Sequence, residues 1–157
     1  MSKNHYLIDL KLEDIHGIRL KPEIEHERAV AIYDLLDGNS FEPDGGFEGP
    51  YKLRLSVREN RLYFDIRTEE DEHLVHVILP LKSFSEIIRD YFLCCESYFT
   101  AIKRESPSRI ESLDMARRGM HNEGSEMLRH RLEGKLKLDF DTARRLFTLI
   151  CVLHIRA

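Results

Sequence analysis

The sequence lacks an apolar run long enough to cross a membrane. Its longest nearly apolar stretch, residues 146–155, is interrupted by Thr148 and His154 and falls well short of the roughly 20 residues that a span needs. The first residues lead directly into an alternating pattern instead of the apolar core of a signal peptide. We therefore expect a soluble protein of the cytoplasm, without a membrane partner.

Cysteine is scarce, with three residues in a chain of 157. An odd number that includes the adjacent pair Cys94 and Cys95 is not a disulfide framework, and it favours a reducing compartment. Both residues lie in a stretch with helical periodicity, where Cys95 falls on the inner apolar stripe. Since no His or Arg follows within one turn to activate a thiol, we expect a packing role.

Motifs that would identify a chemistry are also missing. Gly45-Gly46 lacks the lysine of a phosphate-binding loop, and no Gly-x-Ser-x-Gly elbow is present. His73 and His76 have a spacing found in metal sites, but three residues along a strand place the two rings on opposite faces. No cysteine or acidic residue completes a tetrahedral set beside them. The sequence therefore predicts no metal and no cofactor.

The composition that is present is that of a globular protein, with 42% hydrophobic and 33% charged residues. A chain of 157 residues buries enough surface to hold a core without disulfides, and we expect a single domain over residues 1–157. The formal net charge is −4, but residues 1–102 carry −8 and residues 103–157 carry +4. This asymmetry indicates either an anion site in the second half or attraction between the two halves.

The order of elements predicts an α+β fold with an antiparallel sheet: a β-meander with an added N-terminal strand, packed against several helices. Residues 6–13 alternate as a half-buried strand, and Pro22 and Gly38 mark the ends of the first helix. Residues 39–50 have the composition of a loop. A turn at Glu59-Asn60 fixes the register of the hairpin, which pairs Leu53 with Ile66, Arg54 with Asp65, Leu55 with Phe64 and Val57 with Leu62.

Residues 74–79 form the third strand of the meander. Its outer face is unusually apolar, so we expect another element to cover part of it. The capping box Ser83-x-x-Glu86 then opens a long helix, and Ser106 opens the next one.

In the last third of the chain, Gly119 and Gly124 bracket a polar break, and a shorter helix follows to Leu132. Residues 135–138 predict a short edge strand. Asp139 or Asp141 caps a last helix over about residues 142–155, although residues 149–153 are also compatible with a buried strand.

The greatest density of potential chemistry lies in the predicted break, at Arg117, Arg118, His121, Asn122 and Glu123. The arginines can contact carboxylate or phosphate, and His121 can act as a general acid or base. Backbone amides at the break and the next helix N-terminus would attract an anion. Alternatively, this segment only caps the next helix, and its arginines pair with the acidic first half.

A second pair of cations, Arg144 and Arg145, stands at the start of the last helix. Cations are unfavourable at a helix N-terminus, so these residues need partners. Asp139 and Asp141 are close enough in sequence to supply them, and an external anion or a binding partner is the alternative.

Two stretches resemble an uncharacterised protein family of the alphaproteobacteria. They are residues 114–125 (Asp-Met-Ala-Arg-Arg-Gly-Met-His-Asn-Glu-Gly-Ser) and residues 138–147 (Leu-Asp-Phe-Asp-Thr-Ala-Arg-Arg-Leu-Phe), and residues 15–18 and the hairpin are also similar. The resemblance extends over nearly the whole chain. It implies a small cytosolic bacterial protein without an assigned activity, and it transfers no catalytic or binding residue.

Three functions follow as hypotheses. The first is a non-enzymatic binding or regulatory module that acts through a protein partner or self-association, because the last helix and the outer face of the third strand are apolar. The second is a small enzyme or anionic-ligand sensor that uses residues 117–123. The third is nucleic-acid binding by the basic residues 103–157, although no motif of a known nucleic-acid module supports it. A concave pocket that His121 shares with Arg117 or Arg118 would favour the second.

Overall fold

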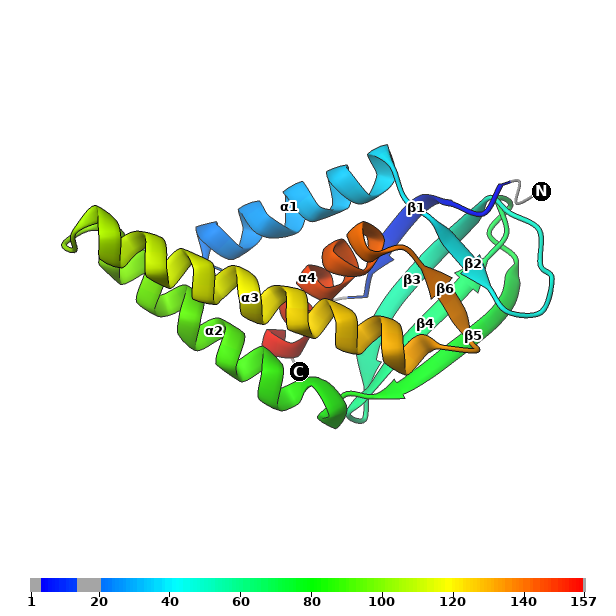
Figure 1. Ribbon diagram of the computed structural model, residues 1–157. Coiled ribbons are helices and arrows are strands. Elements are labelled where there is room, and N and C mark those ends of the chain that lie inside the picture. The colour runs from blue at the N-terminus through cyan, green and yellow to red at the C-terminus, as the bar shows by residue number, and fades with distance from the viewer. Residues whose placement is uncertain (1–3, 14–20, 157) are drawn as a thin grey trace.

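The computed structural model describes residues 4–13 and 21–156. Figure 1 shows a sheet at one end of the molecule and a long pair of helices, α2 and α3, that extends away from it. Among the described residues, no helix combines the length and the apolar content that crossing a membrane requires. The elements are β1 (Leu7–Leu12), α1 (Pro22–Asp37), β2 (Phe41–Pro43), β3 (Tyr51–Arg58), β4 (Arg61–Arg67), β5 (His73–Pro80), α2 (Lys82–Ile102), α3 (Pro107–Leu132), β6 (Leu136–Leu138) and α4 (Phe140–Arg156).

The main sheet has the strand order β1-β3-β4-β5. β3, β4 and β5 form the predicted antiparallel meander, and the added N-terminal strand is present. However, β1 pairs with β3 in parallel, so the sheet is mixed and not wholly antiparallel as expected. The connection explains the difference, because α1 carries the chain back before β3 begins and a helical crossover joins parallel strands. The α+β class is confirmed.

The β3–β4 hairpin has the predicted register, with every predicted pair in place. Glu59 and Asn60 form the turn with φ values of 50° and 61°. A tight hairpin turn requires this left-handed conformation at both central positions. The inward residues Leu55 and Phe64 are fully buried, so a slip of one residue would expose the whole apolar set.

β5 contains a β-bulge at Leu74, which is an extra residue opposite β4. The bulge turns His73 and His76 to the same face, with ring centroids 5.6 Å apart. The prediction of opposite faces is therefore wrong, because it assumed unbroken alternation. Nδ1 of His73 lies 3.0 Å from Oδ1 of Asp65, but the described residues contain no group of three His, Cys, Asp or Glu side chains arranged to hold a metal.

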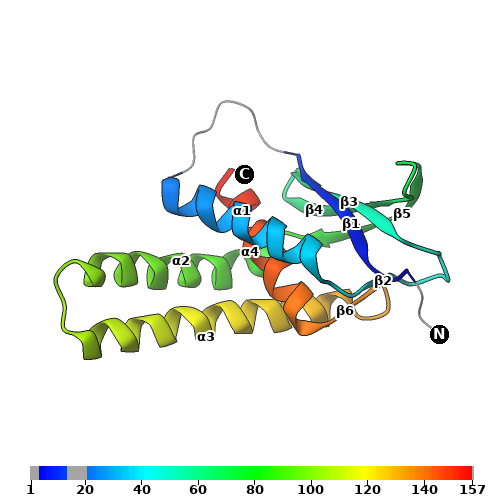
Figure 2. The ribbon, with the colours of Figure 1, turned by 90° about the horizontal axis from the view of Figure 1, so that it is seen from above.

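The outer face of β5 is not covered in the described part of the chain. Ile78 on this face is 37% exposed, and His76 is also exposed. Within residues 4–13 and 21–156, the cover expected for this side is therefore not found at His76 and Ile78, whereas Leu74 packs against the core. In Figure 2 the helices lie on the other side of the sheet.

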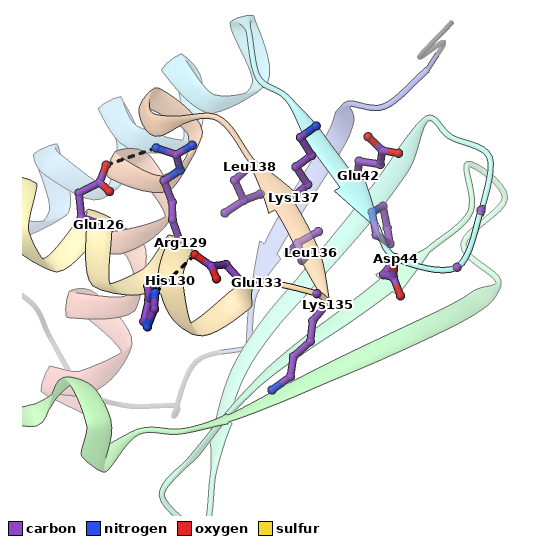
Figure 3. A pocket seen from close by; sticks show the side chains of 14 residues that line it. Glu42, Asp44, Glu126, Arg129, His130, Glu133, Lys135, Leu136, Lys137 and Leu138 are labelled. Atoms are coloured by element: carbon purple, nitrogen blue, oxygen red, sulfur yellow. Dashed lines mark hydrogen bonds and ion pairs between the residues drawn. The ribbon is translucent and has the colours of Figure 1, made fainter.

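Residues 39–50, for which the sequence predicts a loop, contain β2. This strand pairs antiparallel with β6, which confirms the short strand expected at residues 135–138. Figure 3 shows the two strands beside the C-terminal end of α3. A strand of three residues that includes Pro43 is too short to show alternation in sequence, so its partner decides its conformation.

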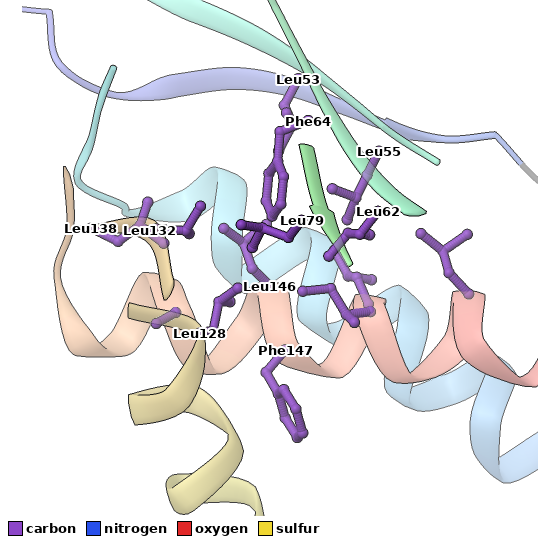
Figure 4. Close-up of a cluster of buried hydrophobic side chains, with 14 of the residues drawn as sticks. Leu53, Leu55, Leu62, Phe64, Leu79, Leu128, Leu132, Leu138, Leu146 and Phe147 are labelled. Carbon is purple, nitrogen blue, oxygen red and sulfur yellow. The ribbon is translucent and has the colours of Figure 1, made fainter. Parts of the chain in front are cut away.

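α4 is the centre of the hydrophobic core. It is helical throughout, so the alternative of a strand over residues 149–153 is wrong. In Figure 4, Leu146 faces Leu79 and the sheet, while Phe147 lies on the other side of the helix. The apolar last helix therefore offers little surface to a partner. Its buried apolar residues are Ala143, Leu146, Phe147, Leu149, Ile150, Cys151, Val152 and Leu153.

The helix ends follow the sequence signals except at α2. Ser106 caps α3 by accepting a hydrogen bond from the amide of Arg109, and Oδ1 of Asp139 caps α4. The Ser83 capping box is absent, because α2 begins at Lys82 with Leu81 as an N-cap that makes no side-chain bond. Leu81 is buried and its amide bonds to the hairpin turn, so tertiary contact sets this helix start.

α3 is a single helix of 26 residues, and the predicted break between Gly119 and Gly124 does not exist. A Cβ atom on Gly124 would lie 2.2 Å from Cζ of Phe147, so Gly124 permits the close approach of α3 and α4. At Gly119 nothing lies within 4 Å of the corresponding position. Gly124 is thus explained by packing, and Gly119 is tolerated on an exposed face.

Candidate functional site

A cavity of about 300 Å³ lies among α1, α2, α3 and α4, and we call it the helical cavity. In Figure 1, α4 lies between α1 and α3. Two adjacent arginines from α3 and two from α4 border this space. Its full lining is His26, Glu27, Val30, Ala31, Asp34, Tyr91, Arg117, Arg118, His121, Arg144, Arg145 and Thr148.

The structure brings three of the five predicted site residues to this cavity. Arg117, Arg118 and His121 line it, which is the arrangement that favours a ligand. Asn122 and Glu123 are exposed and do not line it, so the structure does not bring them together with the other three. Helical geometry is the reason, because residues one and two positions beyond His121 rotate away from its face of a continuous helix.

His121 is 8% exposed and is held between two aromatic rings. Its ring lies edge-on to Tyr91 at 5.3 Å and to Phe147 at 5.2 Å between centroids. Nε2 lies 2.7 Å from Oγ1 of Thr148, whose hydroxyl donates to the carbonyl oxygen of Arg144 at 3.3 Å. Nδ1 is buried without a hydrogen-bond partner. The ring is therefore fixed in position and satisfied on one side only.

The surroundings of His121 oppose its protonation. Burial and then the charges of Arg144 and Arg117 lower its pKa from 6.5 to about 4. The imidazole is consequently neutral at physiological pH, which argues against the possible role of His121 as a general acid or base near neutrality. The two arginine charges add to the effect of burial, which is the larger cause.

The two arginines of α3 are held by local partners. Both form ion pairs with Asp114, and Nε of Arg118 lies 3.1 Å from Oδ2 of this residue. The guanidinium group of Arg117 also lies over the ring of Tyr98, 4.8 Å from its centroid. Nε of Arg117 nevertheless is buried without a hydrogen-bond partner. One carboxylate thus serves two guanidinium groups, and positive charge remains.

The two arginines of α4 do not have the partners that their position predicts. Among the described residues, neither Arg144 nor Arg145 forms an ion pair with Asp139 or Asp141; Asp139 instead accepts from the amide of Thr142. Nε of Arg144 is buried and has no hydrogen-bond partner. The need for a partner at this helix start is therefore not met by the neighbouring aspartates.

Glu27 is the acidic residue that burial affects most at this cavity. Burial raises the pKa of its carboxyl group, while the charges of Arg117 and His26 act in the opposite direction. Glu27 and Asp34 are the acidic side chains of the lining, against four guanidinium groups. The balance favours an anion in the cavity.

The cysteines next to this region have the expected packing role. Cys95 is 8% exposed, and burial raises the pKa of its thiol to about 11. Cys151 is buried in the core, and burial likewise raises its pKa well above the usual value. Thiols with raised pKa values are weak nucleophiles at neutral pH.

Sequence reasoning alone does not join the two arginine pairs. Arg144 and Arg145 each follow the corresponding arginine of α3 by 27 residues. Only the packing of α3 on α4 makes the two pairs neighbours. Their unfavourable place at a helix start is a signal, and it points to an external anion as much as to a local partner. No feature of the sequence indicates that Glu27, Tyr91 and Thr148 belong to the same cavity.

A second hollow, of about 610 Å³, lies at the other end of α3, and we call it the β2–β6 hollow. Figure 3 shows charged side chains of both signs around it. Arg129 pairs with Glu126 at 3.3 Å and His130 with Glu133 at 3.4 Å. None of the buried unpartnered nitrogens found among the described residues lies there. The described residues of this hollow therefore include no buried nitrogen that a charged ligand would satisfy.

Comparisons with known proteins agree on one family. The model of the uncharacterised protein family UPF0262 matches residues 4–156. A relative from Paramagnetospirillum magneticum is 58% identical over 99% of both chains. One from Rhodospirillum rubrum is 58% identical over 99% of this chain and 96% of its own, and one from Agrobacterium fabrum is 55% identical over 99% and 98%.

These relatives are named only as UPF0262 proteins, so they assign no activity. No solved structure shows a significant match to this chain. The family match and the extent of the identities confirm the resemblance seen in the sequence. The chain belongs to the uncharacterised protein family UPF0262.

Proposed function

We propose that this protein binds a small anionic metabolite in the helical cavity and acts as a binding or sensing module. The observation that carries the proposal is a set of three buried nitrogens without a partner on residues that line one cavity: Nε of Arg117, Nε of Arg144 and Nδ1 of His121. Leaving a polar atom buried and unpaired costs about 1–3 kcal/mol. A ligand that supplied partners would recover part of this cost.

The charge of the lining specifies the sign of the ligand. Four arginines and two acidic residues line the cavity, and the charges of Arg144 and Arg117 contribute, after burial, to the lowered pKa of His121. Guanidinium groups bind carboxylate and phosphate oxygens in bidentate geometry. A volume of about 300 Å³ is at the small end for ligand sites and suits a small metabolite.

Binding is favoured over catalysis at this site. His121 and the nearby Cys95 have the greatest potential for acid–base or nucleophilic chemistry, and burial keeps both neutral. The remaining lining supplies charge and hydrogen bonds but no activated nucleophile. A cytoplasmic location is part of this proposal, and the free thiols of Cys94, Cys95 and Cys151 support it.

A thermal-shift screen of phosphate monoesters, nucleotides and small carboxylates tests the proposal. An anion present at 100 times its Kd should stabilise the full chain by about 2.7 kcal/mol. Arg144→Met removes an unpaired guanidinium group and should weaken binding about tenfold or more. Arg129→Met, in the β2–β6 hollow, is the matched control and should leave the shift unchanged. A screen without any hit, or a hit that Arg144→Met leaves intact, contradicts the proposal.

Action through a protein partner or self-association is a second candidate, on different residues from those expected. α4 is buried, but the α2–α3 pair exposes Leu93 at 57%, Ile102 at 48% and Met115 at 59%. These side chains are apolar surface that a partner would bury. Sedimentation of the wild type and of Leu93→Ser tests this candidate, and a wild-type monomer at all concentrations with no captured partner argues against it.

Nucleic-acid binding by residues 103–157 gains no support. Four arginines of this half surround the helical cavity and do not form a basic stripe over an open face. Binding of this kind would weaken steeply with added salt, which offers a simple check.

A further inference from the structure

The two contacts of the Thr148 hydroxyl, 2.7 Å to Nε2 of His121 and 3.3 Å to the carbonyl oxygen of Arg144, indicate which nitrogen of His121 carries the proton. The Thr148 hydroxyl has one proton and donates it to the carbonyl oxygen of Arg144, so it accepts from Nε2 of His121. The neutral imidazole has only one N–H group, and Nδ1 is therefore a lone-pair acceptor. This acceptor is buried and has no donor.

A second acceptor lies on the same cavity. Glu27 of α1 is half-buried there, and no side-chain hydrogen bond holds its carboxylate among the described residues. The unpartnered Nε–H groups of Arg117 and Arg144 are donors. The cavity thus combines donors for an oxyanion with acceptors that an oxyanion without a proton cannot satisfy.

We propose that the helical cavity selects an oxyanion that carries its own hydroxyl proton, such as hydrogen phosphate or an α-hydroxy carboxylate. The inference rests on the proposed function and names its ligand class. The guanidinium groups of Arg117 and Arg144 bind the anionic oxygens, and the ligand hydroxyl donates to Nδ1 of His121 or to the carboxylate of Glu27. A fully ionised oxyanion places lone pairs against these acceptors.

Discrimination of this kind is large, because a wrong ligand leaves a buried acceptor unpaired. Sites built to bond a hydroxyl group reject analogues that lack it by up to about 10⁴–10⁵-fold. A site with one or two acceptors and partial access to water should discriminate less. We expect about a tenfold or greater preference for the ligand with the hydroxyl proton.

The test compares inorganic phosphate with sulfate on the full chain at pH 8 and equal ionic strength. Both are then mainly tetrahedral dianions, but only phosphate carries a hydroxyl proton. Glycolate against acetate is the second pair and separates hydroxy acids from phosphates as the source of the chemistry. Calorimetric titration should give tighter binding for the hydroxylated member of at least one pair, by about tenfold or more.

Two variants assign the preference to its acceptors. His121→Phe keeps a ring between Tyr91 and Phe147 but removes Nδ1, and it should bring the affinity ratio close to one. Glu27→Gln replaces a carboxylate with an amide that can donate, so it should raise the affinity for sulfate or acetate relative to the hydroxylated partner. Glu27 is half-buried, so this variant remains informative if His121→Phe fails to fold. Asn122→Ala, on the exposed face of the same helix, is the control and should keep the wild-type ratio.

The outcomes separate the inference from the proposed function. Binding that depends on Arg144 but shows equal affinity within both pairs overturns the inference and leaves the proposed function standing. A preference that survives both His121→Phe and Glu27→Gln also overturns it. The absence of binding by all four anions and by the wider screen overturns both.

Discussion

The two hollows along α3 differ in a way that their size does not reveal. The β2–β6 hollow is about twice as large, at about 610 Å³ against about 300 Å³. Its charged side chains are paired along the helix, as Arg129 is with Glu126. At the helical cavity, three buried nitrogens lack partners. The comparison teaches that unsatisfied polar atoms, and not volume, distinguish a candidate site from a surface depression.

The largest expected effect is the pH dependence of stability, which should differ between His121 in the helical cavity and His130 in the β2–β6 hollow. The pKa of His121 is about 4 in the folded protein against 6.5 in the unfolded chain, so protons bind preferentially to the unfolded state. The stability that the neutral imidazole of His121 contributes is therefore fully present above pH 6.5 and is lost as the pH falls toward 4. The loss amounts to about 3 kcal/mol.

Urea unfolding at several pH values measures this loss as the difference between wild type and His121→Phe. The difference should shrink by about 3 kcal/mol from pH 7 to pH 4. His130→Gln, where the side chain is 78% exposed in the β2–β6 hollow, should follow the wild-type profile. Parallel profiles for wild type and His121→Phe would show that His121 is not buried as described.

The second effect concerns the contact that brings α3 to α4 beside the helical cavity. Gly124→Ala places a Cβ atom 2.2 Å from Cζ of Phe147, and the overlap should cost about 1–3 kcal/mol. Gly119→Ala meets no atom within 4 Å and should instead stabilise the exposed helix by up to about 1 kcal/mol. Thermal unfolding of the two variants should therefore give shifts of opposite sign. Equal stabilisation by both would contradict the close packing at Gly124.

The smallest effect compares one arginine from each hollow in the absence of ligand. Arg144→Met removes a cation that has like charges around it, so it should raise the stability of the protein by about 0.5 kcal/mol. Arg129→Met removes a surface ion pair and should cost about 0–0.5 kcal/mol. Urea unfolding at low and high salt measures both, and the gain at Arg144 should shrink in salt. A loss of stability in Arg144→Met would mean that its guanidinium group is already satisfied.

Local rules predict those elements in which neighbours along the chain decide the conformation. The β3–β4 hairpin follows from alternation and from the left-handed turn at Asn60, and the caps at Ser106 and Asp139 follow from their side chains. These features need no knowledge of distant residues. The predictions for them are therefore correct for individual residues: the pairs of the hairpin and the two capping side chains.

The wrong predictions fall where distant contacts decide. Gly124 reads as a helix break until Phe147 is placed against it, and Leu81 starts α2 because it is buried beside the hairpin turn. The bulge at Leu74 reverses the expected faces of the two histidines. At the candidate site, Arg117, Arg118 and His121 are predicted by their density of charge, whereas Arg144 joins them only through helix packing.

Two of the helices that line the helical cavity, α1 and α4, come from opposite ends of the chain. α1 and α4 lie side by side, and the amide of Ser40 after α1 donates to Oγ1 of Thr142 in α4 at 2.9 Å across 102 residues of sequence. Contacts of such long range form late in folding, because a large loop must close first. If the proposed anion binds between Arg117 and Arg144, it adds contacts that only the folded chain can make, so its expected kinetic consequence is slower unfolding.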